Sequence, residues 1–215
     1  MPETDWRRTG RGPIWKGMSQ FNDLSSPLRF LETRRSGKPR DMIAPGPDAN
    51  ELNRILTIAA RVPDHGKVAP WRFMVVPPER RGALNAVLDA AYLEEKPGAG
   101  RLELEANAQF AQQAPTLVIV FTKVDPARSI PAEEQIASAA CAAMQMENAA
   151  NASGYVSGWL TGWAAYSDAV HRRLAQPGER IAGFIFMGTP GKPLEERPRP
   201  DMTEIVRTWD GTAAQ

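Results

Sequence analysis

The segment Arg34-Arg35-Ser36 is the first place in the chain where chemistry could be concentrated. Two guanidinium groups and a hydroxyl can donate hydrogen bonds to a phosphate, and each charge-assisted bond contributes about 1.5–3 kcal/mol. The segment ends a predicted helix that begins at Ser26-Pro27, with proline in its first turn. An adjacent arginine pair is by itself more often a solvated helix end, so this motif needs support from elsewhere in the chain.

A second candidate is the stretch from Arg61 to Phe73, which joins a predicted helix to a predicted strand. It carries Arg61, Asp64, His65 and Lys67 among prolines and a glycine, a density of polar groups that a plain connector rarely needs. Loops on a rigid scaffold often hold binding residues. The alternative, a surface loop with Trp71 as a core anchor, stays open on these residues alone.

Two further motifs lie near the ends of predicted strands. Gly158-Trp159-Leu160-Thr161-Gly162 places an aromatic ring and a hydroxyl between glycines, which let a backbone approach a flat ligand closely. Gly188-Thr189-Pro190 is followed by Arg197-Pro198-Arg199-Pro200, which adds cations on a stiff segment. These motifs are candidates for binding a flat ligand that carries phosphate.

Other common catalytic motifs are absent from the sequence. Gly98 and Gly100 do not follow a strand, so they form no dinucleotide fingerprint, and neither a Walker loop nor a nucleophile elbow occurs. We expect His171 to be a solvated surface residue beside two arginines. With His65 and Cys141 as the remaining soft ligands, no metal site is expected. A chain without its own catalytic machinery suits an enzyme whose cofactor does the chemistry.

The hydrophobic pattern predicts the elements that must position these motifs. Apolar residues at helical spacing, with caps and proline or glycine breaks, predict helices over residues 26–34, 48–62, 80–92, 101–113, 131–153 and 167–174. Short apolar runs predict strands over residues 71–76, 117–121, 155–160 and 181–187. Because helices outnumber strands and the connections are mixed, we expect an α+β fold of three layers, with helices on both faces of a small sheet.

The bulk composition indicates a single globular domain. The 215 residues are 42% hydrophobic and 24% charged, and 26 Lys and Arg against 25 Asp and Glu give a net charge of +1. We therefore expect no nucleic-acid partner, and the longest apolar run is too short for a membrane span. The single cysteine favours a reducing compartment, so we expect a cytoplasmic protein. Residues 1–20 are expected to be a disordered lead-in to one domain over residues 21–215, whose tail, 195–209, forms an arm.

In this order along the chain, the motifs resemble the nitroreductase family of FMN flavoproteins, and in particular its compact branch with an Asp-His loop. The resemblance extends from about Pro27 to Trp209. The matching segments are Arg34-Arg35-Ser36, Pro63-Asp64-His65 through Pro70-Trp71-Arg72-Phe73, Trp159-Leu160-Thr161-Gly162, Phe186-Met187-Gly188-Thr189-Pro190 and Arg197-Pro198-Arg199-Pro200.

The resemblance implies a three-layer α/β/α fold with a mixed, mainly antiparallel sheet, in a homodimer whose C-terminal arms lie on the partner and which shares two active sites. FMN would sit at the subunit interface. One subunit would supply Arg34, Arg35 and Ser36 to its phosphate and ribityl end. The remaining implied contacts are Arg61 and His65 from the other subunit, Trp159, Leu160 and Thr161 beside the isoalloxazine ring, and Arg199, with Arg197 as a second choice, near the phosphate.

The resemblance also implies the reaction. NAD(P)H would pass hydride to flavin N5, and a small oxidant such as a nitroaromatic, quinone or enone would then take the electrons, in a ping-pong sequence. The nucleotide-binding stretch would be Ala149, Ala150, Asn151, Ala152, Ser153 and Gly154. Arg61, His65 and Lys67 are the candidates for positive charge near flavin N1, which is a hypothesis.

One departure from the family pattern limits what can be carried over. Many members have Ser-Ser-x-Asn where this chain has Asp64-His65-Gly66-Lys67, so substrate preference cannot be copied from them. Three alternatives remain open at this point. They are another flavin chemistry on the same fold, such as dehalogenation or flavin breakdown, a flavin-binding protein without turnover, and an α+β dimer without flavin.

Overall fold

A computed structural model describes residues 21–211, so the predicted disorder of residues 1–20 lies outside the described residues. The core of the fold is a sheet in the order β2–β3–β5–β4, and the short β1 pairs with the end of β5. Every strand pair within the described residues is antiparallel. The strands are β1 (Met42–Ile43), β2 (Trp71–Val76), β3 (Thr116–Lys123), β4 (Val156–Leu160) and β5 (Glu179–Pro190).

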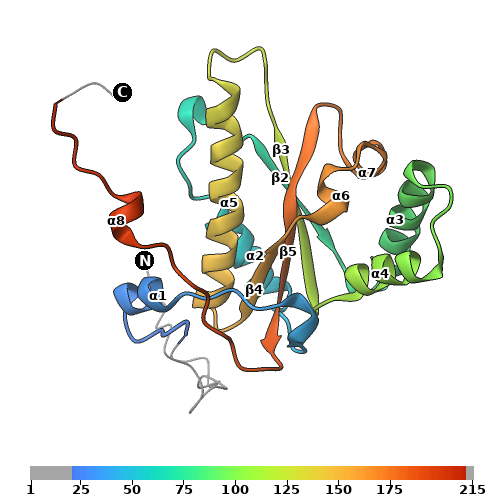
Figure 1. Cartoon of the computed structure of the whole chain (residues 1–215), viewed down its shortest axis with the longest axis horizontal. Helices are drawn as coiled ribbons and strands as arrows, with labels where there is room; N and C mark the ends of the chain where they lie inside the picture. The colour runs from blue at the N-terminus through green and yellow to red at the C-terminus, as the bar shows by residue number, and fades with distance from the viewer. Residues whose placement is uncertain (1–20, 212–215) are drawn as a thin grey trace.

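The two central strands place alternate side chains on opposite faces of the sheet, as the period of a strand requires. On β3, Ile119 and Phe121 join one apolar cluster while Val118 and Val120 join the other. Both faces of the sheet are buried, and helices cover each of them (Figure 1). The predicted three-layer α+β architecture is therefore confirmed.

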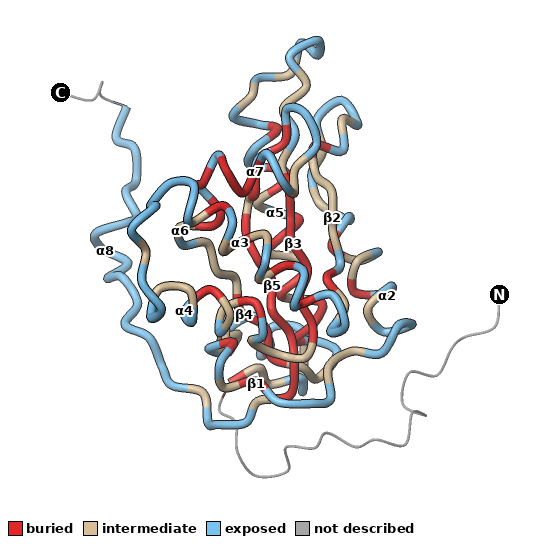
Figure 2. Tube along the Cα trace, turned by 90° about the vertical axis from the view of Figure 1, so that its right-hand side faces the viewer, coloured by how far each residue is buried: buried red, intermediate tan, exposed pale blue. Residues whose placement is uncertain are grey.

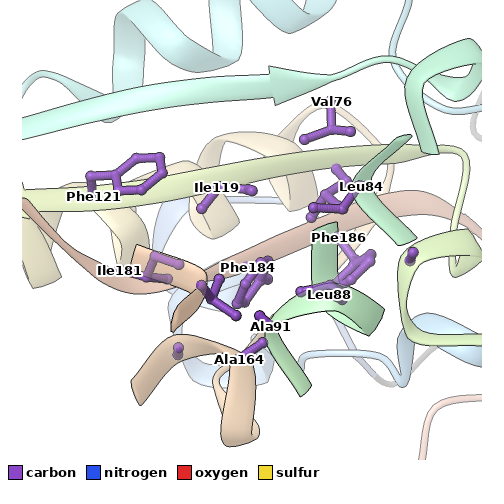
Figure 3. Packing of buried hydrophobic residues seen from close by; sticks show 14 of the residues in the cluster. Val76, Leu84, Leu88, Ala91, Ile119, Phe121, Ala164, Ile181, Phe184 and Phe186 are labelled. Atoms are coloured by element: carbon purple, nitrogen blue, oxygen red, sulfur yellow. The ribbon is translucent and has the colours of Figure 1, made fainter. Parts of the chain in front are cut away.

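One layer contains two longer and two short helices. They are α3 (Arg81–Glu95), α4 (Arg101–Gln112), α6 (Gly162–Tyr166) and α7 (Asp168–Leu174). Their apolar faces meet β3 and β5 around Phe184 and Phe186, with Leu88 and Ala91 of α3 opposite (Figure 3). Phe110 of α4 packs edge-on against both phenylalanines of β5. The burial trace shows β3 and β5 as the buried centre of the molecule (Figure 2).

The other layer consists of α2 (Ala49–Ala59) and the long α5 (Ala132–Ala152). The alanines of α5 let this helix pack closely on the sheet, where Met146 and Ala150 are fully buried. The opposite face of α5 is uncovered in the single chain and carries small or apolar residues. Ile136, Ala137 and Cys141 are exposed along it.

The remaining elements lie at the periphery. The segment that follows α1 (Pro27–Thr33) reaches α5, where Ser36 contacts Glu147. The C-terminal arm with α8 (Met202–Ile205) extends away from the body (Figure 1). Three-residue turns occur at Pro39–Asp41, His65–Lys67 and Pro78–Arg80. The arm exposes large apolar side chains to solvent in the single chain, among them Ile205 and Trp209.

Most of the predicted boundaries agree with these elements. Ser26, Asp48 and Ser167 each cap a helix N-terminus with their side chains, and Asp48 forms the expected capping box with Glu51. The predicted end of the last strand at Gly188 is wrong. Strand β5 continues to Pro190 because β1 pairs with its final residues.

The expectation that His171 is a solvated surface residue is also wrong. It is 7% exposed, and its Nε2 accepts a hydrogen bond from the backbone N–H of Ile181 at 3.1 Å. Helix α7 turns Ala169, Val170 and His171 towards the sheet, while Arg172 and Arg173 reach Glu94 on α3. The histidine therefore joins α7 to β5.

Burial first, and then the charge of Arg180, lower the pKa of His171 below its ordinary 6.5. In the unfolded chain the His171 imidazole takes up a proton near that pH, whereas in the folded chain it takes up the proton only at a lower pH. We predict that stability falls as the pH drops from about 7.5 to about 5.5, and that His171→Gln, which keeps an acceptor but does not titrate, falls less. Thermal unfolding across this range measures the difference. Parallel curves for the two proteins would contradict the prediction.

Candidate functional site

The segment Arg34-Arg35-Ser36 runs from the end of α1 to the edge of the sheet beside β4. The backbone N–H of Gly37 donates to the carbonyl of Ser157 at 2.8 Å. A Cβ on Gly158 would lie 2.6 Å from the carbonyl oxygen of Gly37, so only glycine allows this approach. The side chain of Asn22 accepts from the N–H of Arg35 at 2.8 Å and donates to its carbonyl at 3.1 Å. The segment is thus held on both sides.

A buried carboxylate lies under this segment. The hydroxyl of Ser36 donates to Oε1 of Glu147 at 3.1 Å, and Nη1 of Arg34 donates to the Ser36 oxygen at 3.2 Å. The hydroxyl of Ser157 reaches the same Oε1 at 3.3 Å. Burial raises the pKa of Glu147, and the Arg34 charge and the two hydroxyls partly oppose that rise. These contacts connect the cationic segment to both α5 and β4.

The beginning of the C-terminal arm lies against the same segment. Nε of Arg35 donates to the carbonyl of Glu195 at 2.6 Å, and Nζ of Lys38 pairs with the Glu195 carboxylate at 2.8 Å. A cleft of about 360 Å³ opens between the two stretches. It is lined by residues that include Arg35, Ser36, Lys38, Arg40, Asp41, Lys192 and Glu195. Cations outnumber carboxylates in that lining, which favours an anion nearby.

Arg199 lies farther along the arm and is exposed. Its Nη2 donates to Oε1 of Glu196 at 3.2 Å. The N–H of Arg197 most strongly, and then the charges of Arg199 and Arg35, lower the pKa of Glu196. Arg199 and Arg35 therefore both act on the carboxylate of Glu196.

Arg61 and His65 lie elsewhere. Both are exposed, in the loop that packs against the beginning of α5. Nδ1 of His65 lies 2.7 Å from Oε2 of Glu134, and the hydroxyl of Ser138 donates to the carbonyl of Pro63. In Figure 1 this loop is at one end of α5, and α1 with the cationic segment is at the other. A single chain therefore separates these two groups of predicted site residues.

Trp159, Leu160 and Thr161 end β4 and lead into α6. The indole N–H of Trp159 donates to the carbonyl of Ala182 at 3.1 Å, and the ring packs with the α5 layer. Leu160 packs with the opposite layer. Each of the three is only partly buried, so the end of the strand presents a half-exposed surface beside the Glu147 contacts.

The comparison with known proteins decides the family. The model of the nitroreductase family matches residues 31–189, which is most of the chain. The chain belongs to the nitroreductase family. It is 34% identical over 164 residues to a Haemophilus influenzae protein provisionally named an NAD(P)H nitroreductase, covering 75% of this chain and 87% of the relative.

Solved structures agree on the fold. A nitroreductase-like family protein from Bacillus cereus has a TM-score of 0.73 at 22% identity, over 90% of this chain and all of the other. A Bacteroides fragilis nitroreductase with bound FMN has a TM-score of 0.59 at 23% identity, over 87% of this chain and 98% of the other. The predicted nitroreductase fold is confirmed.

The residues of this nitroreductase-family chain fit FMN in their chemistry. Two guanidinium groups and the Lys38 ammonium lie around a half-buried backbone segment, a donor set suited to a phosphate monoester. The partly buried end of β4 offers apolar surface for a flat ring beside it. The residues that would hold the group in this chain are Arg34, Arg35, Ser36, Trp159, Leu160 and Thr161.

The predicted nucleotide-binding stretch is divided by burial. Ala149, Ala150 and Asn151 are at most 4% exposed, so their side chains cannot reach a nucleotide from this surface. Ala152 and Ser153 are exposed, and Gly154 is half-buried with a positive φ of 89°. Any contact with NAD(P)H at this stretch therefore falls to its last three residues.

Glu147 is the main site residue that the sequence analysis missed. Its signal was an isolated charge on an alanine-rich helix face. Arg72, which belongs to the Trp71-Arg72-Phe73 motif, instead has a structural role, because it pairs with the buried Glu179 through two hydrogen bonds across the sheet. Within residues 21–211, no three His, Cys, Asp or Glu side chains gather where they could hold a metal ion. No helix in that part of the chain has the length and apolar character to span a membrane.

The position of Trp159 depends on a glycine on the neighbouring strand. A Cβ at Gly183 would overlap the indole nitrogen of Trp159. We predict that Gly183→Ala lowers the free energy of unfolding by about 1–3 kcal/mol, because overpacking displaces the ring. Gly82→Ala is the matched control, since Gly82 lies in α3 with open space around it and should gain about 0.5–1 kcal/mol. Urea unfolding compares the two, and an undisturbed Gly183→Ala protein would refute the packing argument.

Proposed function

We propose that this chain binds FMN and transfers hydride from NAD(P)H to a small oxidised acceptor, such as a nitroaromatic, quinone or enone. The observation that carries the proposal is the cationic segment Arg34-Arg35-Ser36, held against β4 and over a buried carboxylate in a chain of the nitroreductase family. When bound, FMN would supply the redox chemistry, which is hydride exchange with NAD(P)H and with the acceptor in a ping-pong order.

The protein's own part is to bind, orient and shield the cofactor. Arg34, Arg35 and Ser36 hold the phosphate end, and Arg199 adds charge from the arm. Trp159 to Thr161 form a wall for the ring, and packing of Trp159 into the α5 layer keeps that wall rigid. Ala152, Ser153 and Gly154 remain the candidates for contact with NAD(P)H.

We propose a homodimer, because the predicted contacts cannot meet within one chain. Glu134, which holds His65, and Glu147, under Ser36, are separated along α5 by about 20 Å at the rise of an α-helix. Two copies related by a two-fold axis can pack their α5 helices antiparallel through the exposed small residues. His65 of the partner subunit would then lie near Ser36.

Two other features support this assembly. The arm exposes Met202, Ile205, Val206 and Trp209, each more than half exposed in the single chain, and these are suited to burial on a partner. Arg61, His65 and Lys67 are exposed in the loop that the assembly would bring to the flavin. They remain the candidates for positive charge near N1. The single cysteine supports a cytoplasmic location.

The visible absorption spectrum of the purified protein tests the proposal. We expect a flavin band that bleaches when NADPH or NADH is added without oxygen, and that returns when a nitroaromatic or quinone is supplied. A band that neither nucleotide bleaches would indicate a flavin-binding protein without turnover. A colourless protein that takes up no added FMN would contradict the proposed function.

A further inference from the structure

Glu147 is buried where a charge is costly. It is 4% exposed and lies on a face of α5 formed mostly by alanine. A buried carboxylate is destabilising unless hydrogen bonds and an opposite charge compensate it. A glutamate at such a position therefore points to a role other than packing. The groups that act on its carboxylate are Arg34, Ser36, Ser157 and the backbone of Trp159, and all of them belong to the segments on which the candidate site is built.

The contacts form a directed chain. A serine hydroxyl has one proton, and at Ser36 that proton points to Oε1 of Glu147 at 3.1 Å. The Ser36 oxygen is then free to accept from Nη1 of Arg34 at 3.2 Å. The carboxylate thereby fixes the rotamer of Ser36, and through it the direction of the Arg34 guanidinium.

The same oxygen also fixes the strand on the other side. Oε1 accepts from the hydroxyl of Ser157 at 3.3 Å, and Ser157 is fully buried on β4. The single proton of that hydroxyl is shared between Oε1 and the nearer Oδ1 of Asn151, at 3.1 Å and one turn farther along α5. The same Oδ1 also accepts from the N–H of Ser157 at 3.0 Å. The carboxylate therefore connects Arg34 and Ser36 to the strand that ends in Trp159.

We propose that Glu147 is a positioning residue for the phosphate of the flavin. It holds Ser36, and through Ser36 the Arg34 guanidinium, so that Arg34 is oriented to bind a phosphate monoester. The site therefore selects FMN over riboflavin, which lacks the phosphate. This inference rests on the proposed function. The residue does not touch the cofactor. It acts through the two side chains above it.

The test is the affinity of the full-length protein for FMN and for riboflavin, measured by flavin fluorescence after the protein is stripped of flavin. Glu147→Leu should weaken FMN binding by about tenfold or more and change riboflavin binding by less than about twofold. Glu147→Gln should recover most of the FMN affinity, because its amide oxygen can still accept from both serines. Met146→Leu, a volume-conserving change at the neighbouring buried position, is the matched control and should leave both affinities unchanged.

A second variant covers the case in which Glu147→Leu does not fold. Ser157→Ala removes one hydroxyl from Oε1 and should weaken FMN binding several-fold without changing riboflavin binding. Wild-type FMN affinity in Glu147→Leu, or in Ser157→Ala where the first variant does not fold, would overturn the proposal. An equal loss of FMN and riboflavin would also overturn it, because that pattern indicates a merely structural role. Wild-type protein that binds neither flavin would instead remove the proposed function itself.

Discussion

The packing of α5 against the sheet is the constraint on which the rest of the structure depends. The helix crosses the face formed by Val118, Val120, Ile185 and Met187, and its alanines bring its backbone close to the strands. One end holds the His65 loop through Glu134 and Ser138, and the other end holds Ser36 and Ser157 through Glu147. The two parts of the candidate site are therefore attached to opposite ends of α5, and the length of this helix fixes the distance between them.

This arrangement explains why the two groups of predicted site residues lie apart in one chain. Because α5 separates its two ends by about 20 Å, a loop movement of a few ångströms does not bring Arg61 or His65 to Ser36. In the proposed homodimer, a two-fold pairing of the exposed α5 faces would bring the two groups together and would form two equal sites. The apolar arm then gains a surface to cover. The fold and the proposed assembly thus both depend on the packing of α5.

Much of the fold could be predicted from sequence because its signals are local. Local signals were enough for several elements: the continuous apolar run of residues 117–121, the capping box at Asp48 and the alanine-rich stretch that forms α5. The extension of β5 to Pro190 could not be predicted, because it depends on pairing with the distant Met42–Ile43. His171 was misassigned because its arginine neighbours suggested solvent. The side chain of His171 points inward because α7 packs against β5, where the N–H of Ile181 donates to the imidazole.

The candidate site shows the same division. Residue types and their order identified Arg34-Arg35-Ser36 and Trp159-Leu160-Thr161, and the structure places these two segments beside the same buried carboxylate. The role of Glu147 depends on three segments that meet only in the folded chain. The burial of Ala149, Ala150 and Asn151 likewise follows from the face of α5 that meets the sheet. The features that could not be predicted are those that depend on burial and tertiary contacts, which no local sequence pattern encodes.

The most direct test of this account is complementation between two variants, each defective in one part of the site. One chain carries Arg34→Ala and the other carries Arg61→Ala with His65→Ala, with different affinity tags so that the mixed assembly can be purified. Each variant alone should retain little FMN. The mixed dimer should regain one tightly bound FMN for every two chains, because one of its sites then contains both wild-type parts. A mixed dimer that retains no more FMN than either parent would show that the two parts do not belong to one shared site, and would contradict the account.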